Sequence, residues 1–388
     1  MITKLLKGAT VEWKNLEDLF DIFSGDDLPK SALSKIKTEK FNIPILSNGI
    51  GRNSLYGYTD TAKIYKPSLT ISARGTIGWT SFRDKPFFPI VRLLVLTPKV
   101  KLNLKYIFYF MKSIEKKYKI QSSSIPQLTI PMIKNIEIPI PPLSVQVEIA
   151  RILDAFTALT AELTAELTAE LKARKKQYNY YRDQLLRFKK GEAEWRTVEE
   201  IFELKNGYTP SKSKTSYWEN GSIPWFRMED LRLNGNVLSD AIQKVHPSGI
   251  KGKLFPANSI IMATTATIGE HALITVEYLS NQRFTNFTVK DAFRERLNIK
   301  FIYYYFFILD QKAKQDISTS SLPSVQMNKL KKWAFPIPPL TEQERIVSVL
   351  DKFDTLTTSI TEGLPKEIAL RQQQYEYYRD QLLNFPKA

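Results

Sequence analysis

The chain has 388 residues, of which 56 are Lys or Arg and 40 are Asp or Glu, so its formal net charge at pH 7 is +16. With 43% hydrophobic and 25% charged residues, it has the composition of a folded protein large enough for two or three domains. It contains no cysteine and only two histidines, His246 and His271, which excludes disulfides, thiolate nucleophiles and the common zinc sites.

The N-terminal sequence lacks the apolar core and the small-residue cleavage site of a signal peptide. No apolar run approaches the ~18 residues that a membrane-spanning helix requires. We therefore expect a metal-free, cytoplasmic protein that neither crosses a membrane nor is exported.

The positive charge is concentrated in the first part of the chain. Residues 1–143 hold 22 basic and 11 acidic side chains, whereas residues 341–388 hold 6 and 8. There is no lysine-rich tail to account for the excess, so a basic surface that meets a polyanion is favoured. In a cytoplasmic protein, nucleic acid is the leading candidate for that partner.

Two segments of the chain have the pattern of mixed α/β domains. In the first, strand-like runs at Ser68–Ile71 and Val91–Leu96 precede a helical stretch at Leu104–Tyr118. In the second, a run at Asn258–Met262 precedes a helical stretch at Ile299–Lys314. The aromatic residues of these helical stretches are predicted to be core rather than base-stacking residues: Tyr106, Phe108, Tyr109, Phe110 and Tyr303 to Phe307.

A long helix is predicted after the first of these segments. Pro141-Pro142 ends an extended stretch, Ser144 is the expected N-cap, and no Gly or Pro interrupts the helical pattern as far as Phe188. At 1.5 Å per residue such a helix is roughly 65 Å long. One small domain cannot bury it, so we expect it to pack against another long helix.

Inside this helix the unit Thr-Ala-Glu-Leu occurs three times between Thr160 and Leu171. Four residues exceed a 3.6-residue turn, so the stripe formed by Leu163, Leu167 and Leu171 rotates slowly around the helix. Each added unit would lengthen the helix by ~6 Å, about the height of two DNA base pairs. We interpret the units as a spacer of adjustable length. The alternative is an ordinary coiled-coil segment whose length sets no distance.

The chain contains an internal duplication. Residues 138–188 align with residues 335–385 without a gap, at an offset of 197, with 26 identities in 51 positions. A weaker similarity, at an offset of 191, relates residues 75–78, Gly-Thr-Ile-Gly, to residues 266–269, Ala-Thr-Ile-Gly. Such a repeat fixes the architecture, because each copy must form the same kind of element.

The second copy of the helix is expected to have Thr341 as its N-cap and to break at Gly363 and Pro365. The predicted fold is therefore α+β, with two mixed α/β domains joined by two long antiparallel helices in a coiled coil with pseudo-twofold symmetry. The two helices have similar sequences, whereas the two domains have diverged. We therefore interpret the domains as binding two different targets while the helices form a common, symmetric scaffold. The predicted boundaries are 1–143 for the first domain, 144–190 for the spacer helix, 191–340 for the second domain and 341–388 for the second helix.

Motifs for autonomous chemistry are missing. The Gly252-Lys253 pair is followed by Leu, so it forms no P-loop. The two Pro-Pro pairs lack the preceding Asp or Asn of an adenine-methylation signature, and no glycine-rich cofactor loop is found. No acidic residues have the spacing of a metal nuclease, and we expect no catalytic role for either histidine.

The polar and basic turns of the two domains are the candidate DNA contacts. Arg reads guanine, Asn and Gln read adenine, and Lys, Ser and Thr hold phosphates. For each residue the alternative is an ordinary solvated turn. In the first domain the candidates are Lys30, Ser31, Arg52, Asn53, Arg74, Thr76 and Arg83, and in the second they are Thr209, Lys212, Lys214, Trp225, Arg227, Thr264, Thr265, Thr267, Asn281, Gln282 and Arg283.

Two motifs carry a resemblance to a known family. One is the segment Ile-Pro-Ile-Pro-Pro-Leu at residues 138–143, with its counterpart Phe-Pro-Ile-Pro-Pro-Leu at 335–340; the other is the ending Tyr-x-Tyr-Tyr-Arg-Asp-Gln-Leu-Leu of both helices. Over its whole length the chain resembles the specificity subunit of type I restriction-modification systems. The Thr-Ala-Glu-Leu units are similar to those of the branch called type IC.

The resemblance implies that each domain is a target recognition domain reading one half of a bipartite, asymmetric DNA sequence, while the helices set the gap. It implies a non-catalytic chain without a cofactor of its own, bound to double-stranded DNA, two N6-adenine methyltransferase subunits and restriction subunits. S-adenosylmethionine, ATP and Mg²⁺ are then expected in those partners. The helix positions implied for helix pairing or methyltransferase docking, two roles that the sequence does not separate, are Gln146, Ile149, Leu153, Asp154, Phe156, Gln343, Ile346, Leu350, Asp351 and Phe353. The apolar stripe of the first helix adds Leu163, Leu167 and Leu171 to the predicted helix interface.

Two other classes of function stay open at this point. An enzyme acting on DNA alone would need a cofactor or metal motif, and methylation or cleavage by the purified chain would establish it. A coiled-coil scaffold would use its domains as protein-binding modules, and its DNA affinity would be indifferent to base sequence.

Overall fold

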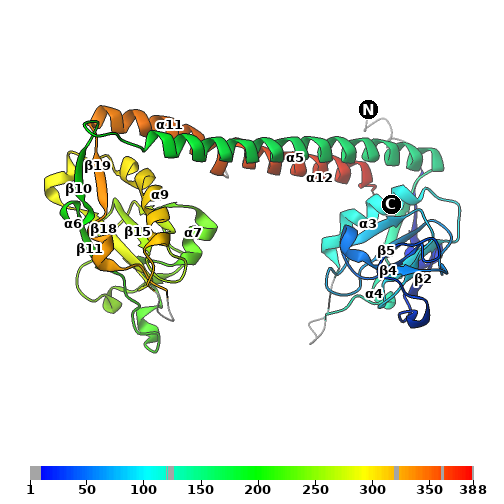
Figure 1. Ribbon diagram of the computed structural model, residues 1–388. Coiled ribbons are helices and arrows are strands. Elements are labelled where there is room, and N and C mark those ends of the chain that lie inside the picture. The colour runs from blue at the N-terminus through cyan, green and yellow to red at the C-terminus, as the bar shows by residue number, and fades with distance from the viewer. Residues whose placement is uncertain (1–9, 119, 121–125, 319–322, 360–361, 387–388) are drawn as a thin grey trace. The chain divides into compact units, whose positions relative to one another are not determined.

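The computed structural model describes residues 10–118, 120, 126–318, 323–359 and 362–386. The chain forms two compact units, of which unit 1 comprises residues 1–168 and 367–388 and unit 2 comprises residues 169–366. Each unit holds one mixed α/β domain together with parts of the long helices (Figure 1). The predicted fold class, α+β with two mixed domains joined by long helices, is confirmed.

The domain of unit 1 is built on two small sheets. The larger sheet is antiparallel, with the order β2 (Phe20–Ser24), β8 (Leu94–Pro98), β5 (Ser68–Ile71) and β6 (Thr80–Arg83). In the smaller sheet, β3 (Ile43–Leu46) pairs antiparallel with β4 (Leu55–Thr59) and parallel with β7 (Phe88–Pro89). A separate antiparallel pair joins β1 (Glu12–Asn15) to β9 (Glu137–Ile140). The helices are α2 (Leu16–Leu19), α3 (Leu104–Ile114) and α4 (Ile130–Ile133), with 3₁₀ turns at Lys30–Ala32, Gly51–Ser54 and Glu115–Lys117.

The domain of unit 2 repeats this plan with additions. Its larger sheet has the order β11 (Phe202–Asn206), β18 (Phe284–Val289), β15 (Ser259–Ala263) and β16 (His271–Ile274), extended by β13 (Val237–Leu238). β12 (Ile223–Phe226) pairs with β14 (Lys244–Val245) and β17 (Leu279–Ser280), and β10 (Glu194–Thr197) pairs with β19 (Ala334–Ile337). The helices are α6 (Val198–Ile201), α7 (Met228–Asn234), α8 (Asp291–Arg294), α9 (Ile299–Gln315) and α10 (Met327–Leu330), with 3₁₀ turns at Thr215–Tyr217 and Pro247–Gly249.

One aromatic helix packs against the larger sheet in each unit, as Figure 1 shows for α3 and α9. Tyr106 on α3 is 0% exposed and Tyr304 on α9 is 2% exposed, so the prediction that these aromatic residues belong to the core is confirmed. Phe108 and Phe307 are half-buried at the margin of the same clusters. These helices lie between the sheets and the long helices, so they connect the two layers of each unit.

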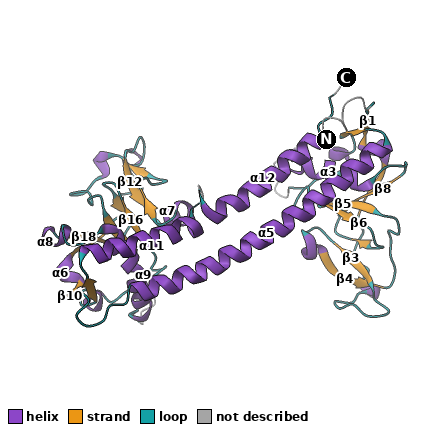
Figure 2. Ribbon diagram, turned by 90° about the horizontal axis from the view of Figure 1, so that it is seen from above, coloured by secondary structure: helices purple, strands orange, loops and turns teal. Residues whose placement is uncertain are grey.

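Three long helices are seen lengthwise in Figure 2: α5 (Leu143–Leu185), α11 (Leu340–Thr358) and α12 (Gly363–Leu383). α5 is one uninterrupted helix of 43 residues, as predicted. The predicted break in the second copy is also present, and Gly363 has a left-handed φ of 76° there. None of the helices in the described part of the chain is both long and apolar enough to cross a membrane.

Local details of three elements differ from the prediction. α5 begins at Leu143 and α11 at Leu340 with Pro339 as N-cap, so neither Ser144 nor Thr341 caps a helix. The Pro-Pro pairs hold extended backbone up to the first helical residue, and the helix starts directly after them. The strand predicted from Val91 begins only at Leu94, because Val91 and Arg92 form a left-handed turn before it.

Candidate nucleic-acid interface

The strand registers of unit 1 gather several loops at one edge of its larger sheet. Ser24 at the end of β2 pairs with Leu94 at the start of β8, and Leu94 pairs with Ile71 at the end of β5. Ile71 in turn pairs with Thr80 at the start of β6. The loops that leave these strand ends therefore meet, and we call this edge the loop edge of unit 1. It carries the segment after β2, the turn before β8 and the loop between β5 and β6.

Hydrogen bonds through Asn48 tie two of these loops together. Its Nδ2 donates to the Val91 carbonyl oxygen (2.8 Å), and its Oδ1 accepts from the Ala73 N–H (2.6 Å). Arg74 at the loop edge donates from Nε and Nη2 to the Gln127 Oε1 (2.9 and 2.7 Å). Beside these loops lies a depression of about 680 Å³, which is lined by Gly25, Asp26, Asp27, Leu28, Arg74, Phe88, Val91 and Arg92.

The same edge exists in unit 2, where Asn206 pairs with Thr285, Ala263 with Phe284, and Met262 with His271. The loop edge of unit 2 brings together most of the candidates predicted in the second domain: Thr209, Thr264, Thr265, Thr267, Asn281, Gln282 and Arg283.

The polar residues of this edge are connected to one another. The Thr209 hydroxyl donates to the Gln282 Oε1, and the Asn281 Oδ1 accepts from the Arg283 N–H (3.0 Å). The Thr264 N–H donates to the Arg283 carbonyl oxygen (3.0 Å). The side chains of Gln282 and Arg283 are exposed, so this edge offers amide and guanidinium groups to a ligand.

Two further candidates of unit 2 lie beside the loop edge, at the end of β12. Trp225 is 2% exposed and its Nε1 donates to the Tyr208 carbonyl oxygen (3.0 Å), so its ring is part of the packing. Arg227 is half-buried, with its Nη2 2.8 Å from the Glu229 Oε2. Neither side chain presents its polar group freely to a ligand in this arrangement.

The remaining candidates other than Thr76 lie away from the loop edges. Arg83, at the far end of β6, donates to the Thr70 and Ser54 hydroxyls (3.1 and 3.3 Å), and burial lowers the pKa of its guanidinium. The exposed residues Ser31, Arg52, Asn53, Lys212 and Lys214 belong to 3₁₀ turns or adjoining loops, and the side chain of Lys30 lies outside the described residues. Thr76 lies in the loop between β5 and β6 of unit 1, and DNA contact by all these residues stays a prediction.

Arg92 and Asn48 were not among the predicted candidates. Arg92 is exposed and lies on the turn before β8, where Arg283 lies on the turn before β18. The two arginines are related by the offset of 191 that also relates residues 75–78 to 266–269. Extending that alignment would have found Arg92, whereas the role of Asn48 depends on contacts that only the fold creates.

A repeated set of contacts joins α5 to the domain of unit 1. Gln146 is 2% exposed; its Oε1 accepts from the Asn103 N–H (2.9 Å) and its Nε2 donates to the Pro141 carbonyl oxygen (2.8 Å). Asp154 accepts from Lys105 Nζ (2.5 Å) and from the Tyr109 hydroxyl (2.7 Å). Burial raises the pKa of Tyr109, so its hydroxyl keeps the proton that it donates to the carboxylate.

The same contacts join α11 to the domain of unit 2. Gln343 is 0% exposed, accepts from the Asn298 N–H (2.8 Å) and donates to the Pro338 carbonyl oxygen (2.8 Å). Asp351 accepts from Lys300 Nζ and from the Tyr304 hydroxyl, both at 2.6 Å. The duplication is therefore repeated contact by contact in space.

The rings of the helices also repeat. In unit 1 the ring centroids of Phe156 and Tyr378 are 5.8 Å apart, and in unit 2 those of Phe353 and Tyr181 are also 5.8 Å apart. In unit 1 α5 therefore lies antiparallel to α12, and in unit 2 it lies antiparallel to α11. The remaining predicted helix positions divide by burial: Ile149, Leu153, Ile346 and Leu350 are fully buried, and Leu163, Leu167 and Leu171 are half-buried. Thus the predicted positions other than these three leucines lie in contacts within each unit, and a part in partner docking stays a prediction for all of them.

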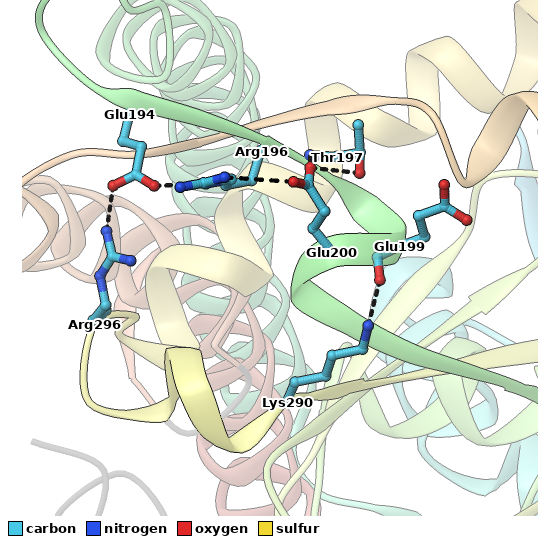
Figure 3. Close-up of polar contacts among 7 residues, drawn as sticks. All are labelled: Glu194, Arg196, Thr197, Glu199, Glu200, Lys290 and Arg296. Carbon is cyan, nitrogen blue, oxygen red and sulfur yellow. Dashed lines mark hydrogen bonds and ion pairs between the residues drawn. The ribbon is translucent and has the colours of Figure 1, made fainter.

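Ionic contacts fix the corner of unit 2 where β10 meets the loop before α9 (Figure 3). Glu194 lies between Arg196 (Nε to Oε1, 2.6 Å) and Arg296, and these two guanidinium groups hold its pKa below the usual range. Glu200 accepts from the Thr197 N–H (2.6 Å) and caps α6. Lys290 donates to the Glu199 carbonyl oxygen (2.5 Å). The corner is built of paired charges, which distinguishes it from the loop edge with its exposed Arg283.

The chain matches the family described as "Type I restriction modification DNA specificity domain" at residues 9–173 and 191–370. It is 38% identical to the type I restriction enzyme EcoR124I/EcoR124II specificity subunit of Escherichia coli, over 100% of this chain and 97% of that protein. It is 33% identical to a type I restriction enzyme specificity subunit of Haemophilus influenzae described as putative, over 99% of this chain and 98% of that one.

Solved structures share the fold. A chain from a structure titled for complex assembly and conformational transition of the type I R-M system matches with a TM-score of 0.70 at 14% identity, covering 98% of both chains. The HsdS subunit from Thermoanaerobacter tengcongensis matches with a TM-score of 0.53 at 15% identity, covering 97% of this chain and 96% of that one. The whole-length sequence relatives and the family match agree, and the chain belongs to the type I restriction-modification specificity subunit family.

Proposed function

We propose that this chain is the sequence-specific DNA-binding subunit of a type I restriction-modification complex, in which each domain reads one half of a bipartite, asymmetric DNA target. One observation carries the proposal. The two units keep the same helix contacts, through Gln146 and Gln343 and through Asp154 and Asp351, but present different polar residues at their loop edges. A common frame with two different reading surfaces suits an asymmetric target.

The long helices set the distance between the half-sites. The Thr-Ala-Glu-Leu units lie inside the uninterrupted helix α5, and Leu163, Leu167 and Leu171 belong to neither buried core. Units can therefore be added or removed without rebuilding either domain. The +16 charge of the chain supplies attraction to the phosphate backbone of double-stranded DNA.

The helices also dock two copies of one methyltransferase subunit. Several exposed apolar residues are identical in the two copies of the duplication and equally exposed: Tyr180 (62%) with Tyr377 (60%), and Tyr181 (42%) with Tyr378 (37%). Tyr180 and Tyr377 each pack edge-on against the neighbouring ring, Tyr181 and Tyr378, yet stay more than half exposed. Two copies of the same partner would require the same exposed residues twice. Restriction subunits join this core.

The chain itself is non-catalytic in this proposal and holds no cofactor. Methyl transfer, with S-adenosylmethionine, and ATP- and Mg²⁺-dependent cleavage belong to the partner subunits, and the complex acts on DNA in the cytoplasm. The sequence of this chain has neither a P-loop nor an adenine-methylation signature, which supports this division.

Co-expression with the methyltransferase subunit in a host that lacks adenine methylation tests the proposal. N6-methyladenine mapped across the genome should reveal a single gapped, asymmetric motif that appears only when both chains are present. The matched controls are each chain alone. Methylation without this chain, or a stable complex that leaves no motif, would contradict the proposed function.

A further inference from the structure

The two loop edges share one loop of the same shape. Between β5 and β6 the Gly78 N–H donates to the Ser72 carbonyl oxygen (2.8 Å), and between β15 and β16 the Gly269 N–H donates to the Ala263 carbonyl oxygen (2.9 Å). Gly75 has a φ of 68° and its counterpart Ala266 a φ of 66°. An alanine accepts this unfavourable left-handed conformation, so the loop shape is held in both units even where the residue changes.

The neighbouring turn has a different shape in each unit. In unit 1 this turn comes before β8, and the Leu93 N–H donates a hydrogen bond across it to the Ile90 carbonyl oxygen (3.1 Å). In unit 2 it comes before β18, and the Phe284 N–H donates to the Asn281 carbonyl oxygen (3.2 Å). The middle residues of the first turn, Val91 and Arg92, have φ values of 55° and 58°. The middle residues of the second, Gln282 and Arg283, are not left-handed. The backbone therefore takes opposite hands through two equivalent turns.

The left-handed turn of unit 1 is strained, because a β-branched residue such as Val91 rarely has a positive φ. Glycine or asparagine would adopt this conformation with less strain, but positions 91 and 92 are occupied by valine and arginine. The fold holds the turn from both sides: the Val91 N–H donates to the Asp26 carbonyl oxygen (3.0 Å), and the Val91 carbonyl oxygen accepts from Asn48. Backbone strain maintained by such contacts is typical of functional sites.

The side chains on these turns are free to meet a ligand. Within the described part of the chain Arg92 has no hydrogen bond or ion pair, whereas Arg74 beside it is held by Gln127. In unit 2 the Thr209 hydroxyl donates to one lone pair of the Gln282 Oε1. The second lone pair can accept from an adenine N6 amino group, and the Nε2 N–H groups can donate to N7. Arg presents a fork that matches the O6 and N7 atoms of guanine, and Gln matches the N6 and N7 atoms of adenine.

We infer that the turn before β8 and the turn before β18, hereafter the recognition turns, are the base-selecting elements of the two half-sites, with Arg92 reading a guanine and Gln282 an adenine. The inference rests on the proposed function and specifies which residues discriminate. The loop of shared shape serves both half-sites alike, and the recognition turn of each unit makes them different. Arg92 and Gln282 are thus specificity-determining residues.

The test compares Arg92→Ala and Arg92→Lys in the co-expressed complex, read out as the methylated motif. Lysine keeps the charge but cannot form the two parallel hydrogen bonds to guanine. Both variants should therefore lose about tenfold to a hundredfold of the discrimination at one guanine of one half-site. The other half-site, read by unit 2, should stay unchanged and reports that the complex is folded. Lys66→Ala is the matched control, since Lys66 is exposed and precedes β5 at the opposite edge of the sheet.

Gln282→Ala is the independent arm and should relax one adenine position in the second half-site only. It decides the question if the Arg92 variants do not assemble. Uniform weakening at all sites by Arg92→Ala, restored by Arg92→Lys, would show a phosphate contact and overturn the inference, as would an unchanged motif. An unaltered chain that produces no motif overturns the proposed function itself, which separates the two failures.

Discussion

Gln343 shows how much one buried side chain contributes to joining a helix to a domain. Its amide accepts from the Asn298 N–H and donates to the Arg296 and Pro338 carbonyl oxygens (2.9 and 2.8 Å), and the residue is 0% exposed. Gln343→Leu would leave these backbone groups without a partner. We expect a loss of about 1–3 kcal/mol in the free energy of unfolding, measured by urea denaturation.

The matched control is Gln373→Leu, because Gln373 is exposed on α12. Surface substitutions of this kind stay within about 0.5 kcal/mol. Equal effects of the two substitutions would show that the Gln343 contacts do not stabilise unit 2.

The buried pair His271 and Asp310 makes the stability of unit 2 dependent on pH. His271 is 1% exposed, its Nδ1 lies 2.7 Å from the Asp310 Oδ2, and its Nε2 lies 3.0 Å from the Tyr303 carbonyl oxygen. Burial raises the pKa of Asp310, against the lowering influence of His271. Between the unfolded pKa of about 3.9 and the raised folded pKa, the native state binds more protons than the unfolded state, so stability falls as the pH rises.

Replacing Asp310 by Asn removes this titration. The free energy of unfolding of the unaltered protein should decline more steeply than that of Asp310→Asn as the pH rises from about 4 through the raised folded pKa. Chemical denaturation at several pH values between 4 and 8 measures both slopes. Parallel slopes would show that Asp310 titrates alike in the folded and unfolded chain.

At the scale of the helix, the exposed tyrosines retained in both copies predict two equivalent docking surfaces. Tyr180→Ala and Tyr377→Ala should each weaken the binding of one methyltransferase subunit by about tenfold or more, since buried tyrosines at interfaces contribute strongly. Native mass spectrometry of the complex should then show one bound subunit in place of two. The double variant should bind neither.

Lys176→Ala is the control for these tyrosines. Lys176 is also exposed on α5, but its counterpart in the second copy is Gln373. It should leave the stoichiometry at two. Loss of both subunits in either single tyrosine variant would contradict independent docking surfaces.

The spacer gives a prediction for α5 as a whole. Deleting Thr168 to Leu171 shortens the helix by about 6 Å and rotates the rest of α5 by about 40°. The mapped motif should therefore have a gap shorter by one or two base pairs, with both half-sites unchanged. Glu166→Gln is the control, because it changes an exposed side chain of the same repeat without changing its length. An altered half-site with an unaltered gap would contradict the spacer function.

At the scale of the whole molecule, local pattern predicted the helices better than the loop edges. The uninterrupted apolar pattern of α5 and the proline-glycine break after α11 are local signals, and both elements were found within a few residues of the prediction. Ser68–Ile71 was also predicted with its observed bounds. These features depend on propensities that neighbouring residues reveal.

The reading surface was only partly predictable, because strand pairing between distant residues creates it. β2 pairs with β8, which brings Gly25 next to Leu93 and places Arg92 at the loop edge. No local signal announces the turn at Val91, since valine favours strands. Trp225 was a candidate contact by residue type, but its place in the central strand of a three-stranded sheet buries it.

The charge of the whole chain predicts how affinity responds to salt. Each phosphate that a basic side chain neutralises releases counterions, so the logarithm of affinity falls with the logarithm of salt concentration by about 0.9 per contact. With a net charge of +16 spread over two DNA-reading units, six to ten contacts would cost roughly a thousandfold to a hundred-thousandfold in affinity between 50 and 200 mM salt. Fluorescence anisotropy of the complex with labelled duplex measures this slope.

The same titration separates the phosphate contribution from base reading. A duplex carrying the mapped motif and a duplex with one half-site scrambled should show similar slopes, because both offer the same phosphates. Their affinity ratio should change little with salt, because hydrogen bonds to bases release no counterions. A flat response for both duplexes would contradict extensive phosphate contact. Equal affinities at every salt concentration would mean that the recognition turn facing the scrambled half-site reads no bases, and the same result with the other half-site scrambled would favour a scaffold over a specificity subunit.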